Sequence, residues 1–199
     1  MDQNVILVET VPLEFDLESL GCRLRIRPGQ TKFMDRLSRL AEEAARVARP
    51  KAVARLCGLT ILDEEKVQVG EVTFSSPLLR QKMDGLGRAF SYLASEGTEL
   101  ADWSLSLSSS LEQVFASALR EVAVQQAENL LERTLLERYG IAQVSAMNPG
   151  SLKVWSLEEQ VPLFELLAPL PEKLGVTLLP SLMMRPEYSV SGVFFQTDS

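Results

Sequence analysis

The sequence contains no histidine, and this absence excludes several kinds of chemistry at once. Ser-His-Asp and Cys-His catalysis both need an imidazole base, and the HExxH metal motif needs two imidazoles. Cys22 and Cys57 are too far apart for the CxxC spacing of iron–sulfur or structural zinc sites, so we expect two reduced, partly buried thiols. We therefore expect neither a catalytic residue nor a metal site in this chain.

Signals for phosphate, membrane and nucleic-acid binding are also missing. There is no GxxxxGK[ST] motif, and Gly85 and Gly87 lack the third glycine and the following helix of a dinucleotide-binding turn. No apolar run reaches the roughly 18 residues that span a bilayer, and the first apolar run is too short for a signal peptide. The net charge of −7 disfavours contact with phosphate backbones. We expect a cytoplasmic protein that binds neither membrane nor nucleic acid.

The 199 residues, 46% of them apolar, suffice for one buried core, so we expect a single domain over residues 1–199. Helical spacing of apolar residues predicts helices at 32–48 and 109–139, the second ending at Gly140, and Ser76 with Pro77 predicts a short helix start. Strand-like patterns occupy 51–74, 87–97, 175–179 and 189–195, while 1–30 look irregular or strand-like and 142–155 look like a loop. Because there is no regular βαβ repeat, the order favours an α+β fold with a largely antiparallel sheet.

Two features of the helices leave alternatives open. The acidic residues Glu128, Glu132 and Glu137 on the long helix either perform acid–base chemistry or form a solvated face with ion pairs to neighbouring arginines; we favour the solvated face. Ser156 and Glu159 have the spacing of a capping box, and Pro162 predicts that the helix after them begins late or bends.

Two late turns are the most informative stretches. In "MNPGSL" (147–152), Asn-Pro-Gly predicts a tight turn with free backbone N–H groups, and Trp155 nearby either walls a pocket or anchors the loop. In "RPEYSVSGVFF" (185–195), a charged turn runs into a strand whose polar positions are small. The small residues allow a ligand or a packing helix to approach the backbone closely. Met147, Met183 and Met184 either fill core gaps or line an adaptable groove.

At these turns the sequence resembles the activation domain of cobalamin-dependent methionine synthase, in particular the stand-alone form of that domain. The resemblance rests on "AENLLERTLLERYG" (127–140), the Pro149–Gly150 loop, a helix end at Leu163, Phe164, Leu166 and Leu167, and a final string at Gly175, Leu178, Ser181, Met184, Pro186 and 189–192. It is good over residues 86–199 and weak over residues 1–85.

The resemblance implies an α+β fold with a curved antiparallel sheet. It also implies binding of S-adenosylmethionine and docking on a corrinoid module, where cob(II)alamin is reduced by an external electron donor and remethylated. We expect the cofactor-contacting residues in the two late turns: Asn148, Pro149, Gly150, Ser151, Trp155, Met184, Arg185, Tyr188, Ser189 and Ser191.

Four departures weaken the expected adenosylmethionine site. The family has an arginine and a tyrosine where this chain has Ala146 and Ser151, and an acidic residue where it has Val124. The chain also stops at Ser199, before a strand that carries a ligand-binding tyrosine in the synthase. Loss of the arginine alone removes a charge-assisted hydrogen bond of about 1.5–3 kcal/mol.

The leading hypothesis is a protein that docks on a corrinoid protein, or on a methionine synthase lacking its own activation domain, and supports remethylation of the cobalamin that this partner carries. An electron-donor protein would then be a further partner. The alternative is a module that binds adenosylmethionine or a corrinoid without a reactivation role. A hydrolase or oxidoreductase is poorly supported because the sequence lacks the residues for such chemistry.

Overall fold

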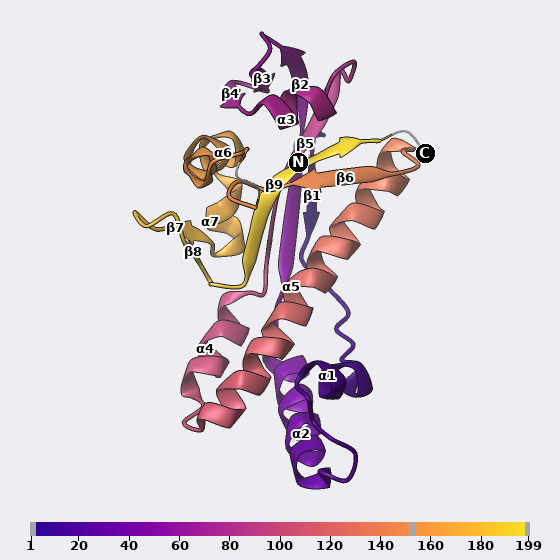
Figure 1. The fold of residues 1–199 in the computed structure, drawn as a ribbon, viewed down its shortest axis with the longest axis vertical. Helices are drawn as coiled ribbons and strands as arrows, with labels where there is room; N and C mark the ends of the chain where they lie inside the picture. Colours follow the sequence, from indigo (N-terminus) through magenta and orange to yellow (C-terminus); the bar gives the residue numbers. More distant parts are fainter. Residues whose placement is uncertain (1–2, 152–153, 198–199) are drawn as a thin grey trace.

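The computed structural model describes residues 3–151 and 154–197. Its centre is an antiparallel sheet in which strands are ordered β4-β3-β2-β5-β9-β6, with β1 paired to β2 (Figure 1). The strands are β1 (Val5–Val8), β2 (Lys51–Ile61), β3 (Lys66–Val69), β4 (Val72–Ser75), β5 (Arg88–Ser95), β6 (Val144–Met147) and β9 (Ser189–Gln196). A separate two-stranded hairpin joins β7 (Thr177–Leu178) to β8 (Met184–Arg185).

Strands β5 and β9 form the middle of the sheet. They pair from Phe90 opposite Phe194 to Ser95 opposite Ser189. Nearly all of their residues are buried because helices cover both faces of the sheet, which explains why both segments are so rich in apolar residues. The predicted antiparallel sheet is confirmed, since every strand pair is antiparallel.

The helices follow from clear local signals where these exist. They are α1 (Leu17–Arg23), α2 (Thr31–Val47), α3 (Pro77–Lys82), α4 (Thr98–Ser106), α5 (Ser110–Tyr139), α6 (Gln160–Leu167) and α7 (Leu170–Leu174), with a single 3-10 turn at Leu157–Glu159. Ser76 caps α3 by accepting a hydrogen bond from the Leu79 N–H, and α5 ends at Gly140 in the left-handed region. At about 1.5 Å per residue, α5 extends about 45 Å, from beside α4 to the level of β6 (Figure 1).

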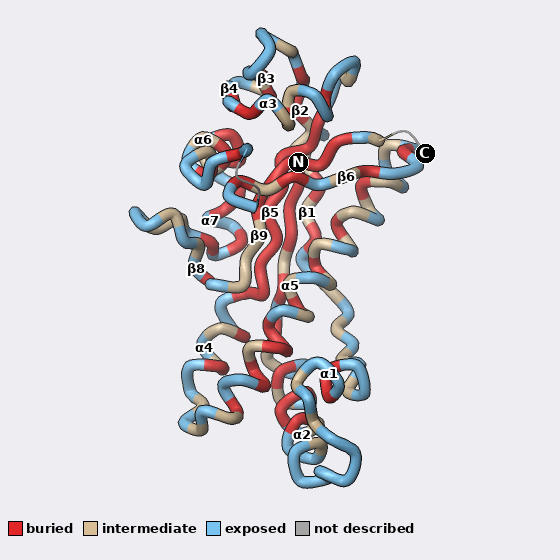
Figure 2. Tube along the Cα trace, in the orientation of Figure 1, coloured by how far each residue is buried: buried red, intermediate tan, exposed pale blue. Residues whose placement is uncertain are grey.

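Apolar side chains gather in three clusters, and α5 takes part in two of them. One cluster lies between the sheet and α3, α6 and α7. A second lies between the opposite face of the sheet and the C-terminal half of α5, and a third joins α1, α2, α4 and the N-terminal half of α5. Figure 2 shows buried residues running along the central strands and continuing into the helical part. We call the third cluster and its helices the helical lobe.

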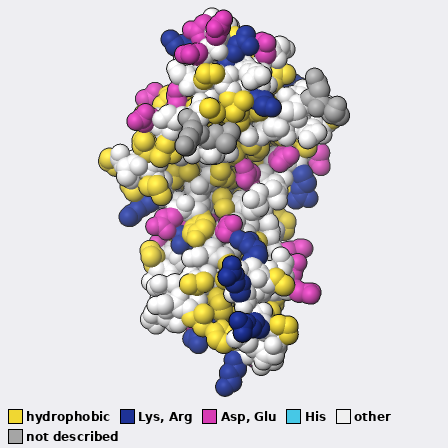
Figure 3. All heavy atoms as spheres, viewed as in Figure 1, with side chains coloured by type: hydrophobic (Ala, Val, Ile, Leu, Met, Phe, Trp, Pro, Cys, Tyr) yellow, Lys and Arg dark blue, Asp and Glu magenta, His cyan; other side chains and the backbone are white. Residues whose placement is uncertain are grey.

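Charge is distributed unevenly between these parts. Ten of the 20 Lys and Arg residues lie between Arg23 and Arg55, together with only three of the 27 acidic residues. Many of these basic side chains belong to α1 and α2, and Figure 3 shows Lys and Arg side chains gathered over the helical lobe. The molecule is therefore acidic overall but basic at one end.

Several sequence-based expectations were wrong. The expected loop at 142–155 contains strand β6. The region 1–30, expected to be irregular or strand-like, contains strand β1 but also helix α1. Helices α4 and α7 were not expected. The expected capping box is also absent, because Ser156 accepts from the Glu158 N–H while Glu159 accepts from the Ser75 N–H. The late start of α6, after a 3-10 turn, is confirmed.

The thiols match the expectation in part. Cys22 and Cys57 are both free, but Cys22 is exposed whereas Cys57 is buried. Burial raises the pKa of the Cys57 thiol, which favours its protonated, unreactive form.

Candidate functional site

The loop after β6 is attached to β9 by one side chain. Asn148 donates from Nδ2 to the Ser191 carbonyl at 2.8 Å and to the Tyr92 hydroxyl at 2.7 Å. The Ser151 hydroxyl donates to the Asn148 carbonyl, and Gly150 has a φ of 80°, which a side chain would strain. The two motifs that carry the family resemblance, Asn-Pro-Gly and Ser-Val-Ser-Gly, are therefore in direct contact.

Gly192 makes this contact possible. A Cβ atom at this position would collide with the Met147 carbonyl oxygen and lie 2.6 Å from Asn148 Nδ2. The glycine in the second motif is thus required by the first motif, not by an external ligand. This observation favours close packing within the protein as the reason for the small residue at Gly192.

The outer edge of β9 is only partly covered. Strand β6 pairs with Val193–Gln196, and the Asn148 side chain donates a hydrogen bond to the Ser191 carbonyl. The preceding residues of β9, beginning at Ser189, have no β6 partner. The loop and this stretch of β9 together form the candidate site, which we call the β9 edge site.

A buried polar chain lies beneath the β9 edge site. Tyr92 donates to Glu128 Oε1 at 2.7 Å and stacks on Phe194 with ring centroids 3.9 Å apart. Burial, and next the nearby Glu128 carboxylate, raise the pKa of Tyr92 well above its usual value. Glu128 therefore connects α5 to the site, in contrast to the solvated role that its helix position predicts.

The expected ion pairs of the same helix are not formed. Within the described residues, Glu132 and Glu137 make no salt bridge, and Arg138 donates to the carbonyls of Gln3 and Val5. Arg138 thus holds the N-terminal strand instead of a neighbouring carboxylate.

Trp155 anchors the loop from within. Its side chain is fully buried and contacts Phe74 edge-on, with ring centroids 5.5 Å apart. The Trp155 carbonyl also accepts from the Gly150 N–H at 2.9 Å. Of the two roles considered for Trp155, anchoring is the one observed.

Ser191 points to the opposite face of the sheet from Asn148. Its hydroxyl accepts from Gln160 Nε2 at 3.2 Å, and both side chains are buried. The Ser189 hydroxyl donates to the Pro186 carbonyl at 2.8 Å and lies within hydrogen-bond distance of Ser95 Oγ, at 3.0 Å. These serine hydroxyls are therefore occupied by contacts within the protein, and any ligand at the β9 edge site would meet backbone groups first.

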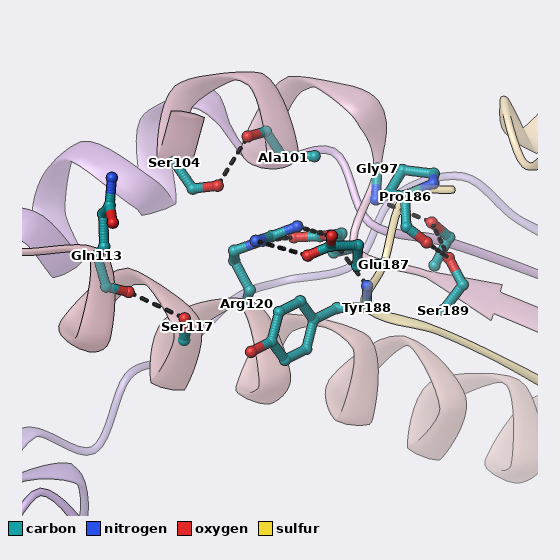
Figure 4. Close-up of polar contacts among 12 residues, drawn as sticks. Gly97, Ala101, Ser104, Gln113, Ser117, Arg120, Pro186, Glu187, Tyr188 and Ser189 are labelled. Atoms are coloured by element: carbon teal, nitrogen blue, oxygen red, sulfur yellow. Dashed lines mark hydrogen bonds and ion pairs between the residues drawn. The ribbon is translucent and has the colours of Figure 1, made fainter. Parts of the chain in front are cut away.

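The second turn is organised by an ion pair that the sequence did not reveal. Arg120 on α5 donates from Nε and Nη2 to the two carboxylate oxygens of Glu96, at 2.6 and 2.7 Å. The Tyr188 ring lies against the Arg120 guanidinium, with 4.5 Å between the ring centroid and the guanidinium carbon (Figure 4). The backbone N–H of Tyr188 donates to Glu96. Tyr188 is thereby fixed in both backbone and side chain.

The two turns contact the same helix at different positions. Asn148 reaches α5 through Tyr92 and Glu128, and Tyr188 packs on Arg120 of α5. Eight residues separate these two helix positions, which is about 12 Å at the α-helical rise. The turns therefore share one side of the molecule, although each has its own set of partners.

The methionines divide between core and surface. Met147 is buried, Met184 is half-buried against the same apolar cluster, and Met183 is 56% exposed. Core filling is therefore observed for Met147 and in part for Met184, and a groove lined by Met183 stays a prediction.

The positions that depart from the family pattern offer no charged groups. Ala146 is exposed on β6, opposite Phe194, and Val124 packs partly buried against the sheet. Ser151 is exposed and bonded to Asn148. None of these three side chains supplies a cation for a carboxylate or an aromatic surface for a base.

Sequence reasoning missed Tyr92, Glu96, Arg120 and Gln160. The only signal was their position, since Glu96 directly follows the largely apolar core of strand β5 and Arg120 lies on the apolar side of α5. A charged residue at an apolar position is a fair indicator of a buried pair, but it does not identify the partner.

The described residues contain no cluster of three or more His, Cys, Asp or Glu side chains suited to a metal ion. Among the same residues, no helix combines the length and apolar character that a bilayer crossing requires.

Comparison with solved structures identifies the fold. The chain is similar to the MetH reactivation domain, in a crystal structure bound to AdoHcy, with a TM-score of 0.65 and 16% identity over 96% of this chain and 78% of that chain. The expected α+β fold of the activation domain is therefore confirmed. No protein-family model matches the sequence, and no curated protein matches it.

Proposed function

We propose that this chain is an activation-domain-like protein that docks on a cobalamin-carrying methyltransferase and supports reductive remethylation of its cob(II)alamin. The observation that carries this proposal is the bond between Asn148 and the Ser191 carbonyl, which joins the two resembling motifs at one edge of the sheet. The fold similarity over 96% of the chain supports it. The cobalamin would belong to the partner, and the electrons would come from a donor protein.

The surface next to the β9 edge site suits a partner. Val154, Leu157 and Val161 lie just after the Asn-Pro-Gly loop and at the start of α6, and they are 47%, 40% and 43% exposed. Leu157 also packs against Gly150, so this apolar surface continues into the loop. Exposed apolar side chains that cluster beside a loop are typical of protein-binding surfaces.

The residues present fit adenosylmethionine poorly. Its carboxylate would need a cation beside the Asn-Pro-Gly loop, but neither Ala146 nor Ser151 supplies one. The proposed function therefore rests on docking to the partner and assigns no step to bound adenosylmethionine.

The test is a titration of a cob(II)alamin-loaded methionine synthase fragment that lacks its own activation domain. We expect this chain to bind the fragment and to change the visible and electron paramagnetic resonance spectra of the cobalt. Val161→Asp should weaken binding at least about ten-fold by placing a charge in the apolar contact. Val114→Asp, at a 55% exposed valine on the distant end of α5, is the matched control and should bind normally.

The absence of both binding and spectral change would rule out this function. Equal weakening by the two aspartate variants would show that docking occurs elsewhere on the surface.

The alternative is a module that binds adenosylmethionine or a corrinoid without a reactivation role. The AdoHcy bound in the similar structure supports this alternative. Calorimetry with adenosylmethionine and with free cobalamin separates the two functions. Tight binding of adenosylmethionine without any corrinoid partner would favour the alternative, and it would also show that Ala146 and Ser151 do not prevent binding.

A further inference from the structure

A separate cavity lies at the opposite end of β9 from the Asn-Pro-Gly loop. It has a volume of about 280 Å³ and is enclosed by α4, α5, the end of α7 and the turn between β8 and β9. This is slightly below the roughly 300–1,000 Å³ of cavities that hold drug-sized molecules, so a smaller metabolite would fill it. The lining includes Ala101, Asp102, Leu105, Arg120, Arg185 and Glu187.

Arg120 presents one uncommitted nitrogen in this cavity. Its side chain is only 9% exposed, and Glu96 occupies Nε and Nη2. Within the described residues, the charged partner of Nη1 is Glu187 Oε2, which at 3.8 Å lies beyond hydrogen-bond distance. Figure 4 shows the Arg120 guanidinium against the Tyr188 ring, with Glu187 beside it and Ala101 of α4 on the other side. The cation is therefore fixed in place and retains donors for a further acceptor.

The remaining charges in the lining are of both signs. Arg185 adds a second guanidinium and makes no salt bridge within residues 3–151 and 154–197. Asp102 and Glu187 add two carboxylates, and the Glu187 side chain is 70% exposed and can turn away. A simple anion would be repelled by these carboxylates, and a simple cation by the guanidinium groups.

The cavity also has an apolar side. Leu105 is 79% exposed, the largest exposure among the large hydrophobic residues of the described chain, and it lies in the lining with Ala101 and Pro186. An exposed leucine at the mouth of a charged cavity would gain burial if an apolar group of a ligand covered it.

We propose that this cavity binds a small zwitterion, an α-amino acid with an aliphatic side chain. Its carboxylate would accept hydrogen bonds from Arg120 Nη1 and Arg185, taking the place that Glu187 now partly fills. Its ammonium group would face Asp102, and its side chain would cover Leu105. Such a ligand matches both signs of charge and the apolar wall, and the proposal is independent of corrinoid docking.

Calorimetry on the whole chain with L-leucine as the probe tests this proposal. L-leucinamide lacks the carboxylate and N-acetyl-L-leucine lacks the ammonium group, so we expect each to bind at least about ten-fold more weakly than L-leucine. A different aliphatic amino acid that binds in place of leucine, with the same dependence on both charged groups, would equally support the site. No binding by any standard amino acid at millimolar concentration would overturn the proposal, as would binding of either derivative as tightly as L-leucine.

Variants locate the binding without disturbing the buried ion pair. Arg185→Gln and Asp102→Asn change exposed side chains, and each should lower the affinity for L-leucine about ten-fold while leaving the melting temperature unchanged. Arg46→Gln, at an exposed arginine of α2, is the matched control and should bind normally. Unchanged affinity in both cavity variants would show that the amino acid binds elsewhere.

Discussion

At the scale of single residues, the Glu96–Arg120 pair is the most consequential contact. Glu96 is fully buried and Arg120 nearly so, and the pair connects the end of β5 to α5 and the turn before β9. We expect Arg120→Met to lower the free energy of unfolding by about 3–5 kcal/mol, because it leaves a buried carboxylate without a partner. Urea denaturation measures this loss. Glu96→Gln combined with Arg120→Met should recover part of it, and no recovery would mean that the loss comes from packing.

The same variant should depend on pH in a defined direction. Burial raises the pKa of Glu96 above its ordinary value near 4.5, while Arg120 opposes that rise. Removing Arg120 therefore raises the pKa further, so the folded variant favours the protonated carboxyl. The stability that protonation provides is present below the ordinary pKa and is lost as pH rises through the raised folded value. Urea denaturation should show a larger deficit at about pH 8 than at about pH 5, and a deficit independent of pH would contradict this.

Gly192 offers a second test at the residue scale. Gly192→Ala places a methyl group against the Met147 carbonyl and Asn148, so it should lower the free energy of unfolding by about 1–3 kcal/mol. Gly58→Ala on β2 is the matched control, since a Cβ atom there meets nothing within 4 Å. Thermal denaturation of both variants measures the difference. If they lost equal stability, strand propensity and not the close approach would be the cause.

For most important contacts, the sequence singled out one of the two residues but not its partner. Asn148 and Ser191 stood out because turn chemistry and small residues are visible locally. Their neighbours Tyr92 and Glu128 lie 56 and 20 positions from Asn148, and no local pattern indicates which distant residues will meet. The candidate site was therefore found as two separate turns, without the polar network beneath it.

At the scale of elements, long helices and strands that carry several agreeing sequence signals were predicted, and several short ones were not. The long helix was placed within one residue at its start because an extended apolar face and a glycine stop agree. Strand β6 has four residues and was missed, since its strand conformation comes from pairing with β9 and not from its own pattern. Apolar spacing does not determine burial along the whole helix: Val114 is 55% exposed, because a 30-residue helix is covered by different neighbours along its length.

The N-terminal segment before α1 provides a prediction at this scale. Gln126 on α5 clamps Glu14 from both sides, accepting from its N–H at 3.1 Å and donating to its carbonyl. Gln126→Ala should speed amide hydrogen exchange in the segment around Glu14 at a cost of about 1 kcal/mol in global stability. Gln125→Ala is the control, since Gln125 bonds only to Glu128 and Asn129 on its own helix. Equal exchange in the two variants would show that apolar contacts hold the segment.

At the scale of the whole molecule, α5 joins two of the three apolar clusters, the helical lobe and the cluster between α5 and the sheet. Leu119 belongs to the helical lobe, whereas Leu131 packs on the sheet, and one continuous helix carries both. The lobe cannot lose its packing without freeing half of that helix. Sequence alone suggested a long central helix but not this division, because the division depends on where α1, α2 and α4 fold back.

This arrangement predicts one cooperative unfolding transition, which the two tryptophans can report separately. Trp155 is buried beside the sheet and Trp103 packs on the helical lobe, so Trp103→Phe and Trp155→Phe each leave one local probe. In each variant the fluorescence transition in urea should coincide with the loss of helical circular dichroism. Leu119→Ala, added to Trp103→Phe, should lower the free energy of unfolding reported by Trp155 fluorescence by about 2–5 kcal/mol. This is expected although Leu119 lies in the helical lobe and Trp155 in the cluster between the sheet and α6. A Trp155 signal that stays in place while helical signal is lost would mean that the lobe unfolds alone and that α5 does not couple the two ends.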